Sequence, residues 1–272
     1  MTSTFDRDLA PALAAMARKA GRVILDVYET DFTVTIKANQ TPVTEADARA
    51  EEVILADLHR IAPSIPVISE EAGGPVPPGP APERFFLVDP LDGTREFIER
   101  NGEFTVNIAL IEAGRPVAGV VLAPAIKRMF LACGEGHAFE LPARAETSDV
   151  PGRDAWRAIA TRASRPDALR AVASRSHRNA QTDAFLARIG AHSIVIAGSS
   201  LKFCLLACGE ADVYPRHGRT MEWDTAAGQA VLEAAGGVVL TLGGEALRYG
   251  KGEEGYVNPP FIAWRHRDIA TV

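Results

Sequence analysis

One stretch constrains the fold of this chain more than any other: the apolar run 85–88, which two acids in a turn follow at once. The run is apolar enough for a buried strand. It delivers Asp89 and Asp92 into a segment that Gly93 marks as a turn. Thr94 stands where a helix could begin, and the free N–H groups of a helix start can receive an anion. The stretch therefore predicts either a joint metal and phosphate site or an ordinary capped turn.

Composition permits a large folded enzyme and argues against nucleic acid as a partner. With 272 residues, 47% of them hydrophobic, the chain can bury the core of one large domain or of two ordinary ones. The net charge of −6 lacks the basic surplus of a nucleic-acid binder. A small anionic substrate stays compatible with this charge, because a bound cation or a local basic patch can overrule the overall sign.

The N-terminal region and the cysteines predict a cytoplasmic protein. Residues 1–20 lack the layout of a signal peptide, and no apolar run reaches membrane-spanning length. Cys133, Cys204 and Cys208 are too few, and odd in number, for a disulfide framework. Cys204 and Cys208 could form a metal pair, but their apolar neighbours favour two packed thiols. We expect no membrane insertion and leave peripheral association with the inner membrane open.

Patterns in the first half predict two helices and a mainly antiparallel sheet. Residues 8–28 have the apolar spacing of a helix, and a second helix follows Thr44. Residues 72–82 hold five prolines and three glycines and predict a surface loop. The predicted strands are 32–37, 65–69, 85–88, 105–112, 117–122, 129–133 and 134–140, with a short helix at 96–100 and a hairpin turn at 114–116.

The second half predicts an α/β arrangement. Residues 142–166 are polar and loosely patterned, so we divide the chain near here into subdomains 1–150 and 151–272. Strands are expected at 171–174, 192–197, 211–214 and 238–240, and helices at 182–189, 200–208 and 224–235.

Two acids of the first half have plain structural interpretations. Thr44 can cap the helix that follows, and Asp47 stands three residues on, close to a capping box. On this segment alone the capping interpretation is favoured. Glu70 ends a short strand, where adjacent glutamates are usually solvated, although Glu70 and Asp89 could still lie side by side.

Three polar stretches of the second half could contact a ligand or could be ordinary. Ser199 and Ser200 begin a helix whose N-terminus could hold a phosphate, with Lys202 as a point charge, or one serine could simply cap that helix. Asp224 could be an N-cap. His177 lies in a polar loop, where a histidine is more often solvated than functional.

Together these stretches resemble the inositol monophosphatase superfamily of metal-dependent phosphatases. The matching signatures, in order, are residues 42–47 (PVTEAD), 69–71 (SEE), 89–94 (DPLDGT) and 223–228 (WDTAAG). Residues 95–110, 198–204 and 214–216 are further similar to the 3′(2′),5′-bisphosphate nucleotidase branch. The resemblance covers nearly the whole chain and is weakest over residues 143–170.

The resemblance implies a five-layer α-β-α-β-α sandwich with the site between two subdomains. It also implies two or more Mg²⁺ ions, which prefer carboxylate and carbonyl oxygens. Several carboxylates in one cleft repel one another and need divalent cations to coexist, and such ions can activate a water and polarise a phosphoryl group. The implied metal ligands are Glu70, Asp89, the carbonyl of Leu91, Asp92 and Asp224.

The same resemblance gives roles to further residues. Asp47 and Thr94, with Glu70, would orient and deprotonate the attacking water, so the capping interpretation of Asp47 is set aside. The N–H groups of Gly93 and Thr94 would hold the phosphate. Further substrate contacts are implied for Ser176, His177, Ser199, Ser200, Lys202, Arg216 and Asp224.

The implied activity is that of a Mg²⁺-dependent phosphatase acting on small phosphate esters. The leading substrate is 3′-phosphoadenosine 5′-phosphate, giving AMP and phosphate in sulfur assimilation and nucleotide recycling, and inhibition by Li⁺ is also implied. The alternative is an inositol monophosphatase or broad-specificity sugar phosphatase that uses the same metals.

Rival classes fail at specific positions. An EF-hand loop from Asp89 would need an acid where Arg100 stands. Haloacid-dehalogenase-type phosphatases have two aspartates separated by one residue, whereas two separate Asp89 and Asp92. No Walker A sequence supports a kinase. A non-enzymatic metal-binding regulatory protein is the alternative of another class, and the intact pair of Asp47 and Thr94 argues against it. The oligomeric state stays open.

Overall fold

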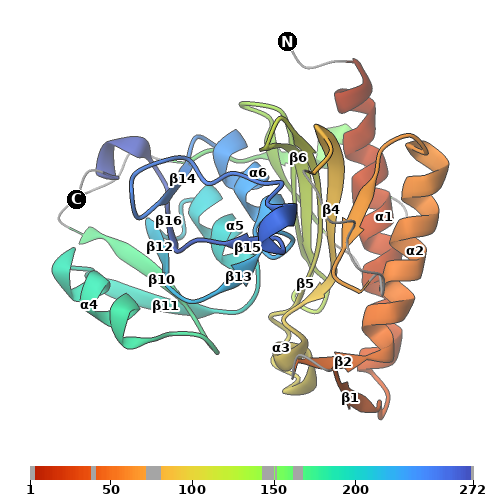
Figure 1. Ribbon diagram of the computed structural model, residues 1–272, viewed down its shortest axis with the longest axis horizontal. Helices are drawn as coiled ribbons and strands as arrows, with labels where there is room; N and C mark the ends of the chain where they lie inside the picture. The colour runs from red at the N-terminus through yellow and green to blue at the C-terminus, as the bar shows by residue number, and fades with distance from the viewer. Residues whose placement is uncertain are drawn as a thin grey trace.

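The described part of the chain forms five layers, α-β-α-β-α, which follow one another from right to left in Figure 1. The structure is a computed structural model that describes residues 4–37, 41–71, 81–142, 150, 152–161 and 168–270. This architecture is the predicted one. The predicted loop at 72–82 lies mostly outside the described residues.

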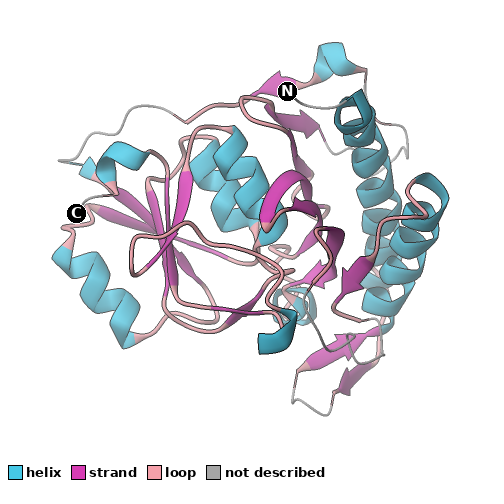
Figure 2. Ribbon diagram, turned by 45° about the horizontal axis from the view of Figure 1, so that its top comes forward, coloured by secondary structure: helices cyan, strands magenta, loops and turns pink. Residues whose placement is uncertain are grey.

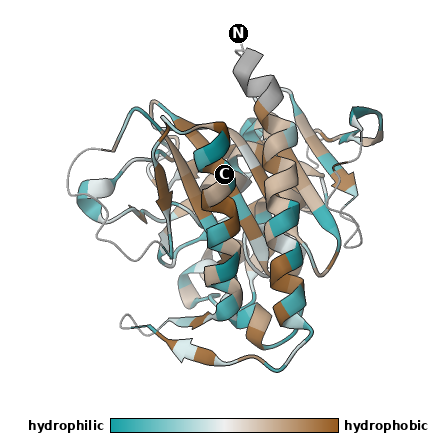
Figure 3. Ribbon diagram, turned by 90° about the vertical axis from the view of Figure 1, so that its right-hand side faces the viewer, coloured by the Kyte–Doolittle hydropathy of each residue, from teal (hydrophilic) through white to brown (hydrophobic). Residues whose placement is uncertain are grey.

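The first layer consists of α1 (Thr4–Tyr28) and α2 (Glu45–Ile61), which lie side by side in Figure 3. Each helix there carries both hydrophilic and hydrophobic residues, as expected for one covered and one exposed face. Leu13, Ile24 and Ile54 are fully buried against the sheet. Helix α1 begins four residues before the predicted start at residue 8.

The second layer is a seven-stranded sheet of order β3-β4-β5-β6-β7-β8-β9, in which β3 and β4 are parallel and every other neighbouring pair is antiparallel. Both faces are covered by helices, which explains the nearly continuous apolar runs of its central strands. The strands are β3 (Val67–Ser69), β4 (Arg84–Asp92), β5 (Thr105–Glu112), β6 (Arg115–Ala123), β7 (Arg128–Cys133), β8 (Ala138–Pro142) and β9 (Arg157–Ala158).

The hairpin between β5 and β6 corrects one prediction. The turn lies at Ala113 and Gly114 rather than at 114–116, because Arg115 already pairs with Glu112. Both turn residues have positive φ, 48° and 72°. Two such residues give a tight turn whose twist matches that of the flanking strands.

The third layer is a pair of central helices, α5 (Leu201–Ala207) and α6 (Ala226–Ala234), which Figure 2 shows between the two groups of strands. Helix α6 packs closely on β6 at Gly119, where an added Cβ would lie 3.0 Å from the Ala230 Cβ. The apolar cluster around these helices joins both sheets into one core.

The fourth layer is a five-stranded sheet of order β11-β10-β12-β16-β14, and α4 (Ala180–Arg188) covers its outer face as the fifth layer. Strands β10, β11 and β12 are parallel, whereas β16 is antiparallel to both of its neighbours. The strands are β10 (Arg170–Ser174), β11 (Ser193–Ala197), β12 (Val213–Arg216), β14 (Val238–Thr241) and β16 (Phe261–Trp264).

Several short elements were not predicted. One of them is β16, which inserts between β12 and β14. Two small pairs of strands also lie beside the sheets: β1 (Val34–Ile36) with β2 (Pro42–Thr44), and β13 (Thr220–Met221) with β15 (Val257–Asn258). Of these four strands only β1 was predicted, within the range 32–37. A short helix, α3 (Thr94–Ile98), follows β4 and begins two residues before the predicted range of 96–100.

The division of the chain near residue 150 stays a prediction. Much of 143–167 lies outside the described residues, and β9, which follows this position, still pairs with β8 of the first sheet.

Candidate metal and phosphate site

A bulge in β4 brings two aspartates to the same face of the first sheet. Leu87 faces the central helices, and simple alternation along the strand would put Asp89 and Asp92 on opposite faces. The register with β5 shifts between them, because Asp89 lies opposite Asn107 and Asp92 lies opposite Thr105. Three steps along β4 thus match two along β5. Both aspartates line the pocket beside the central helices.

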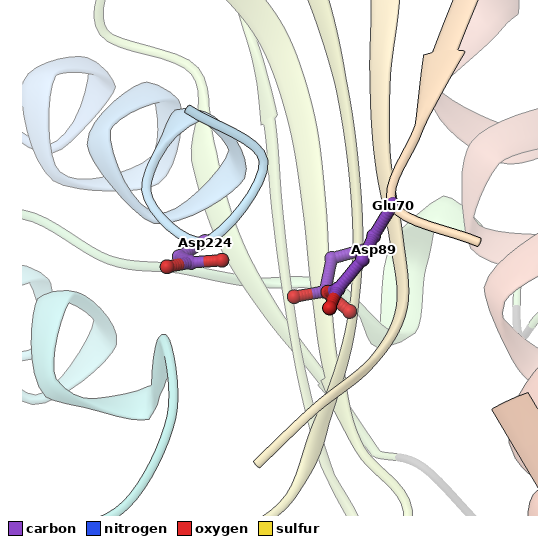
Figure 4. Close-up of side chains that lie close together, drawn as sticks. All are labelled: Glu70, Asp89 and Asp224. Atoms are coloured by element: carbon purple, nitrogen blue, oxygen red, sulfur yellow. The ribbon is translucent and has the colours of Figure 1, made fainter. Parts of the chain in front are cut away.

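Three acids from separate elements converge in this pocket. Glu70 follows β3, Asp89 ends the regular part of β4, and Asp224 precedes α6. One ligand atom from each lies within 4.8 Å of the others, and Figure 4 shows Glu70 and Asp89 close together with Asp224 across from them. The Glu70 N–H donates to the Val88 carbonyl at 3.2 Å, so the parallel pairing of β3 and β4 places the first two acids side by side.

Burial and mutual repulsion raise the pKa values of these acids. Burial is the main cause, and the neighbouring carboxylates add to it, so the pKa of Asp89 and that of Asp224 lie well above their usual range. The pKa of Glu70 is raised to about 7 by burial, although Lys37 opposes this shift. A bound divalent cation would remove the repulsion, and hard carboxylate oxygens are the ligands that Mg²⁺ prefers. The donor set therefore fits such an ion.

Asp92 lines the same pocket but is held differently. Its Oδ2 accepts hydrogen bonds from the Ser200 N–H at 2.6 Å and from Asn107 Nδ2 at 3.2 Å. The Leu91 backbone is also engaged, because its N–H donates to Asp89 Oδ1 at 3.1 Å and its carbonyl accepts from Thr94 Oγ1 at 3.5 Å. All five predicted ligand residues thus line one pocket, and three of them form the tight group.

Asp47 shows that the capping interpretation was set aside wrongly. The capping box is present: Asp47 Oδ2 accepts from the Thr44 N–H and from Thr44 Oγ1, both at 2.8 Å. The other oxygen, Oδ1, accepts from Thr94 Oγ1 at 3.4 Å. One carboxylate therefore caps α2 and also contacts Thr94. Burial raises its pKa to about 6, against the opposing hydrogen bonds from Thr44.

Gly93 connects the acids to α3 in a conformation that suits glycine. Its φ is 89°, and an added Cβ would lie 2.2 Å from Ser199 Oγ. Gly93 is the residue before α3, which has five residues. Gly93 and Thr94 both line the pocket, and phosphate binding by their N–H groups stays a prediction.

Basic side chains line the same pocket as the acids. They are Arg95, His177, Lys202 and Arg216. The pKa of His177 is lowered by burial and by the charges of Arg216 and Arg95. Arg95, Lys202 and Arg216 therefore make a cationic region in this pocket, whereas the lowered pKa leaves His177 mainly uncharged near neutral pH.

Arg216 and Lys202 differ in how far their charges are already engaged. Arg216 is 7% exposed and donates from Nη2 to the Arg219 carbonyl at 2.9 Å, while its Nε is buried and has no hydrogen-bond partner among the described residues. Lys202 is buried as well, but its ammonium donates to the Ser199 carbonyl at 2.5 Å and lies over the Tyr214 ring. Burial lowers the pKa of Lys202 to about 8, with Asp92 opposing the shift.

The predicted serine contacts are occupied within the protein. Ser199 Oγ lies 2.8 Å from the Asp92 carbonyl and 2.7 Å from the Glu103 carbonyl. Ser200 Oγ donates to the Asp224 carbonyl, and Ser176 Oγ donates to the Glu96 carboxylate at 2.7 Å. Of these serines only Ser199 lines the pocket, so substrate contacts by Ser176 and Ser200 stay predictions.

Sequence reasoning missed several residues of this region. Lys37 forms ion pairs with Glu70, at 3.6 Å, and with Glu71. Glu96 is buried, and so is Asn107, whose amide contacts Asp92. The sequence did carry one sign of Asn107, because this amide interrupts the apolar strand 105–112. A buried amide without hydrogen-bond partners would cost free energy, so its presence there indicates a specific partner.

Comparisons with known proteins show the family to which the chain belongs. Residues 6–269 match the model of the inositol monophosphatase family. The chain belongs to the inositol monophosphatase family. It is a member of a phosphatase family, as predicted, and an enzyme rather than a purely regulatory metal-binding protein.

Relatives within the family share most of their length with this chain. It is 46% identical over 252 residues to the 3′(2′),5′-bisphosphate nucleotidase CysQ of Shigella flexneri and 45% identical to that of Escherichia coli (strain K12). Each match covers 90% of this chain and 95% of the relative. These similarities confirm the predicted family and nucleotidase branch.

Solved structures agree as well. The crystal structure of CysQ from Bacteroides thetaiotaomicron superimposes with a TM-score of 0.80 at 39% identity, covering 93% of this chain and 95% of that one. The extragenic suppressor protein suhB from Bartonella henselae, at 24% identity and a TM-score of 0.73 over 96% and 94% of the two chains, shows the shared fold. Within the described residues, no helix is both long and apolar enough to cross a membrane.

Proposed function

We propose that this protein is a 3′(2′),5′-bisphosphate nucleotidase that removes the 3′-phosphate of 3′-phosphoadenosine 5′-phosphate to give AMP and phosphate. The observation that carries the proposal is the pairing of two regions in one pocket: acids that suit divalent cations and basic side chains that suit a second phosphate. The names of the relatives at 45–46% identity support the same activity. An inositol monophosphate carries no second phosphate for such a cationic region to hold.

The acidic region would hold two or more Mg²⁺ ions. Glu70, Asp89, Asp92 and Asp224 would supply carboxylate oxygens and Leu91 a carbonyl, and Mg²⁺ commonly keeps several waters besides such ligands. When bound, the ions would polarise the phosphoryl group, activate a water and stabilise the leaving oxygen.

The attacking water would be oriented by Thr94 and Asp47. The Thr94 hydroxyl lies within hydrogen-bonding distance of two acceptors, Asp47 Oδ1 and the Leu91 carbonyl. When its single hydrogen points to Asp47, the Thr94 oxygen can accept a hydrogen bond from water. Asp47 would accept the proton that passes through this pair, and the N–H groups of Gly93 and Thr94 would hold the phosphate. No serine or cysteine nucleophile is needed in this scheme, and hydrolysis would proceed without a phosphoenzyme.

The 5′-phosphate would bind in the cationic region. Arg216 is the strongest candidate, because a buried guanidinium retains donors that a phosphate oxygen can accept from, in the bidentate geometry that arginine favours. His177 would contribute at the exposed rim. Lys202 would add positive charge to the region rather than a direct hydrogen bond to the phosphate. Its ammonium already donates to two backbone carbonyls, those of Ser199 and Ala197.

The test is a comparison of two substrates that differ only in the 5′-phosphate. We expect Arg216→Ala to lower kcat/KM for 3′-phosphoadenosine 5′-phosphate by at least tenfold, since charged hydrogen bonds contribute about 1.5–3 kcal/mol. Activity toward adenosine 3′-phosphate should change much less. Arg219→Ala is the matched control, because it removes the same charge from an exposed neighbour while its backbone carbonyl remains.

Two results would overturn this proposal. One is an equal loss of kcat/KM for both substrates in Arg216→Ala, which would show that Arg216 does not bind the 5′-phosphate. The other is a wild-type preference for inositol 1-phosphate or fructose 1,6-bisphosphate over the nucleotide, which would favour an inositol or broad-specificity sugar phosphatase with the same metal site.

We further propose that the enzyme works in the cytoplasm, in nucleotide recycling linked to sulfur assimilation. Its three cysteines, Cys133, Cys204 and Cys208, are too few and odd in number for a disulfide framework, as is usual in a reducing compartment. We also propose inhibition by Li⁺, measurable as a loss of phosphate release when LiCl replaces NaCl at equal ionic strength.

A further inference from the structure

We propose that Asn107 and Ser200 form a positioning pair that fixes the carboxylate of Asp92 for cation binding and ties it to the backbone of Asp224. The inference rests on the divalent-cation site proposed above. It adds two residues that would not touch the cation themselves but would determine how well it is bound.

Asn107 occupies a position where an amide needs a specific reason to be present. It lies on β5 directly opposite Asp89 and is 1% exposed. Ala109 and Ile111, on the same face of the strand, pack in the apolar core around the central helices. Burying an amide costs free energy unless its hydrogen-bonding groups find partners. The Asn107 nitrogen has two partners, whereas its oxygen has none among the described residues.

Both hydrogens of the Asn107 amide are directed at the site. Nδ2 donates to Asp92 Oδ2 at 3.2 Å and to Ser200 Oγ at 3.0 Å. The amide must present its nitrogen here, because a carboxylate oxygen can only accept. Ser200 Oγ can accept as well, because its own hydrogen goes to the Asp224 carbonyl at 2.5 Å.

Ser200 closes the network from the other half of the molecule. Its N–H donates to the same Asp92 Oδ2 at 2.6 Å, and it stands immediately before α5. Asp92 Oδ2 is thus held between a strand of the first sheet and the start of a central helix. The other oxygen, Oδ1, would then be the one that binds the cation, in the pocket that Asp92 lines.

This arrangement would prepare Asp92 before any cation arrives. A carboxylate that is already oriented loses little freedom on binding, and groups that orient metal ligands typically affect metal affinity 10–100-fold. The link from Ser200 to the Asp224 carbonyl also fixes the relative position of ligands that come from the two halves of the chain.

The experiment measures cation affinity without substrate. Chelator-treated protein is titrated with Mn²⁺, and the free ion is followed by its electron paramagnetic resonance signal. We expect Asn107→Ala to weaken binding about 10–100-fold and Ser200→Ala to weaken it less, since the Ser200 N–H remains. Ser200→Thr keeps a hydroxyl and should restore most of the affinity. The losses of Asn107→Ala and Ser200→Ala should not add in the double variant, because the residues act as a unit.

A control distinguishes positioning from general loosening of the core. Gln229 is an equally buried amide on α6 whose hydrogen bonds go to Glu233, Leu247 and Tyr249 rather than to the pocket acids. Gln229→Met should lower the melting temperature but leave Mn²⁺ affinity unchanged.

The possible results separate the two proposals. Unchanged affinity in Asn107→Ala, or an equal loss in Gln229→Met, would overturn the positioning pair while the proposed function stands. If Asn107→Ala does not fold, the contrast between Ser200→Ala and Ser200→Thr decides the question, and equal affinities would overturn the pair. If the wild type binds Mn²⁺ but does not hydrolyse the nucleotide, the pair stands and the substrate proposal fails. A wild type that binds no divalent cation would overturn both.

Discussion

At the scale of single residues, Asp47 joins a structural contact to the contact on which its proposed catalytic role depends. Its two oxygens have separate partners, Thr44 on one side and Thr94 on the other. The cap is worth about 1 kcal/mol to the protein, whereas a positioned general base contributes about 10²–10⁴-fold to a rate. The two roles can therefore be separated by measuring stability and turnover on the same variants.

We predict that Asp47→Asn and Thr94→Val lower kcat by about 10²-fold or more and change KM little. Both would act on the attacking water rather than on the bound substrate. Thr94→Ser keeps the hydroxyl and should retain most of the activity. Hydrolysis in ¹⁸O-water should place the label in the first phosphate released. A raised KM at normal kcat, or a trapped phosphorylated side chain, would contradict this role.

Some residues of the candidate site could be predicted from the sequence and others could not. Asp89 and Asp92 follow an apolar strand, so their convergence with Glu70 was readable from local pattern and resemblance. The positions of Asn107 and Lys37 could not be predicted, because their contacts are with residues distant in the sequence. Asn107 contacts Ser200, and Lys37 pairs with Glu70. For Asp47 the sequence indicated the cap, which the structure confirms, and the error lay in setting the cap aside. Its role in the site stays a prediction.

At the scale of elements, the turn from β4 to α3 decides where the acids point. The bulge between Asp89 and Asp92 reverses the strand's alternation, and Gly93 then reaches a positive φ that most residues avoid. The close approach of Ser199 Oγ to this glycine joins the turn to the start of α5.

We predict that Gly93→Ala destabilises the protein by more than the roughly 1–2 kcal/mol that positive φ alone costs an L-residue. The excess would come from the clash with Ser199. Gly244→Ala is the matched control, because Gly244 has a φ of 83° and nothing within 4 Å of an added Cβ.

Thermal unfolding of these variants gives the comparison, with Gly93→Ala/Ser199→Ala added to relieve the crowding. We expect the double variant to recover part of the lost stability. Equal losses in Gly93→Ala and Gly244→Ala would mean that Ser199 yields freely and does not fix the turn.

Most longer elements could be predicted because their apolar spacing follows the period of a helix or strand. Strand β5 was predicted with its full bounds, 105–112. The exceptions have a common cause. Strand β16 and the pair β13 and β15 are short, and their pairing is set by contacts with distant strands rather than by their own pattern.

At the scale of the whole molecule, the five layers place two oppositely charged regions where the first sheet meets the central helices. The first sheet supplies Glu70, Asp89 and Asp92, while the second half supplies Asp224, Lys202 and Arg216. The layer order followed from the family resemblance, but the seam of hydrogen bonds from Ser199 and Ser200 to Asp92 required the structure.

This gathering of acids predicts how stability depends on pH. Burial and neighbouring charges raise the pKa values of Asp89, Asp92 and Asp224, and that of Glu70 to about 7. The folded metal-free protein therefore holds protons that the unfolded chain releases. Stability from such groups is fully present below their ordinary pKa values, near 4, and is lost as pH rises through the folded values.

We predict that the melting temperature of chelator-treated protein falls as pH rises from 5 to 8, and that excess Mg²⁺ largely removes this fall. For Glu70 alone, raising the pKa from 4.5 to about 7 corresponds to on the order of 3 kcal/mol at high pH. Glu70→Gln should therefore flatten the profile. Glu112→Gln is the control, because Glu112 at the end of β5 pairs with Arg84 rather than with the pocket acids, and it should leave the profile unchanged. A melting temperature that rises between pH 5 and 8 without metal, or that falls equally with Mg²⁺ present, would show that the acid cluster does not control stability.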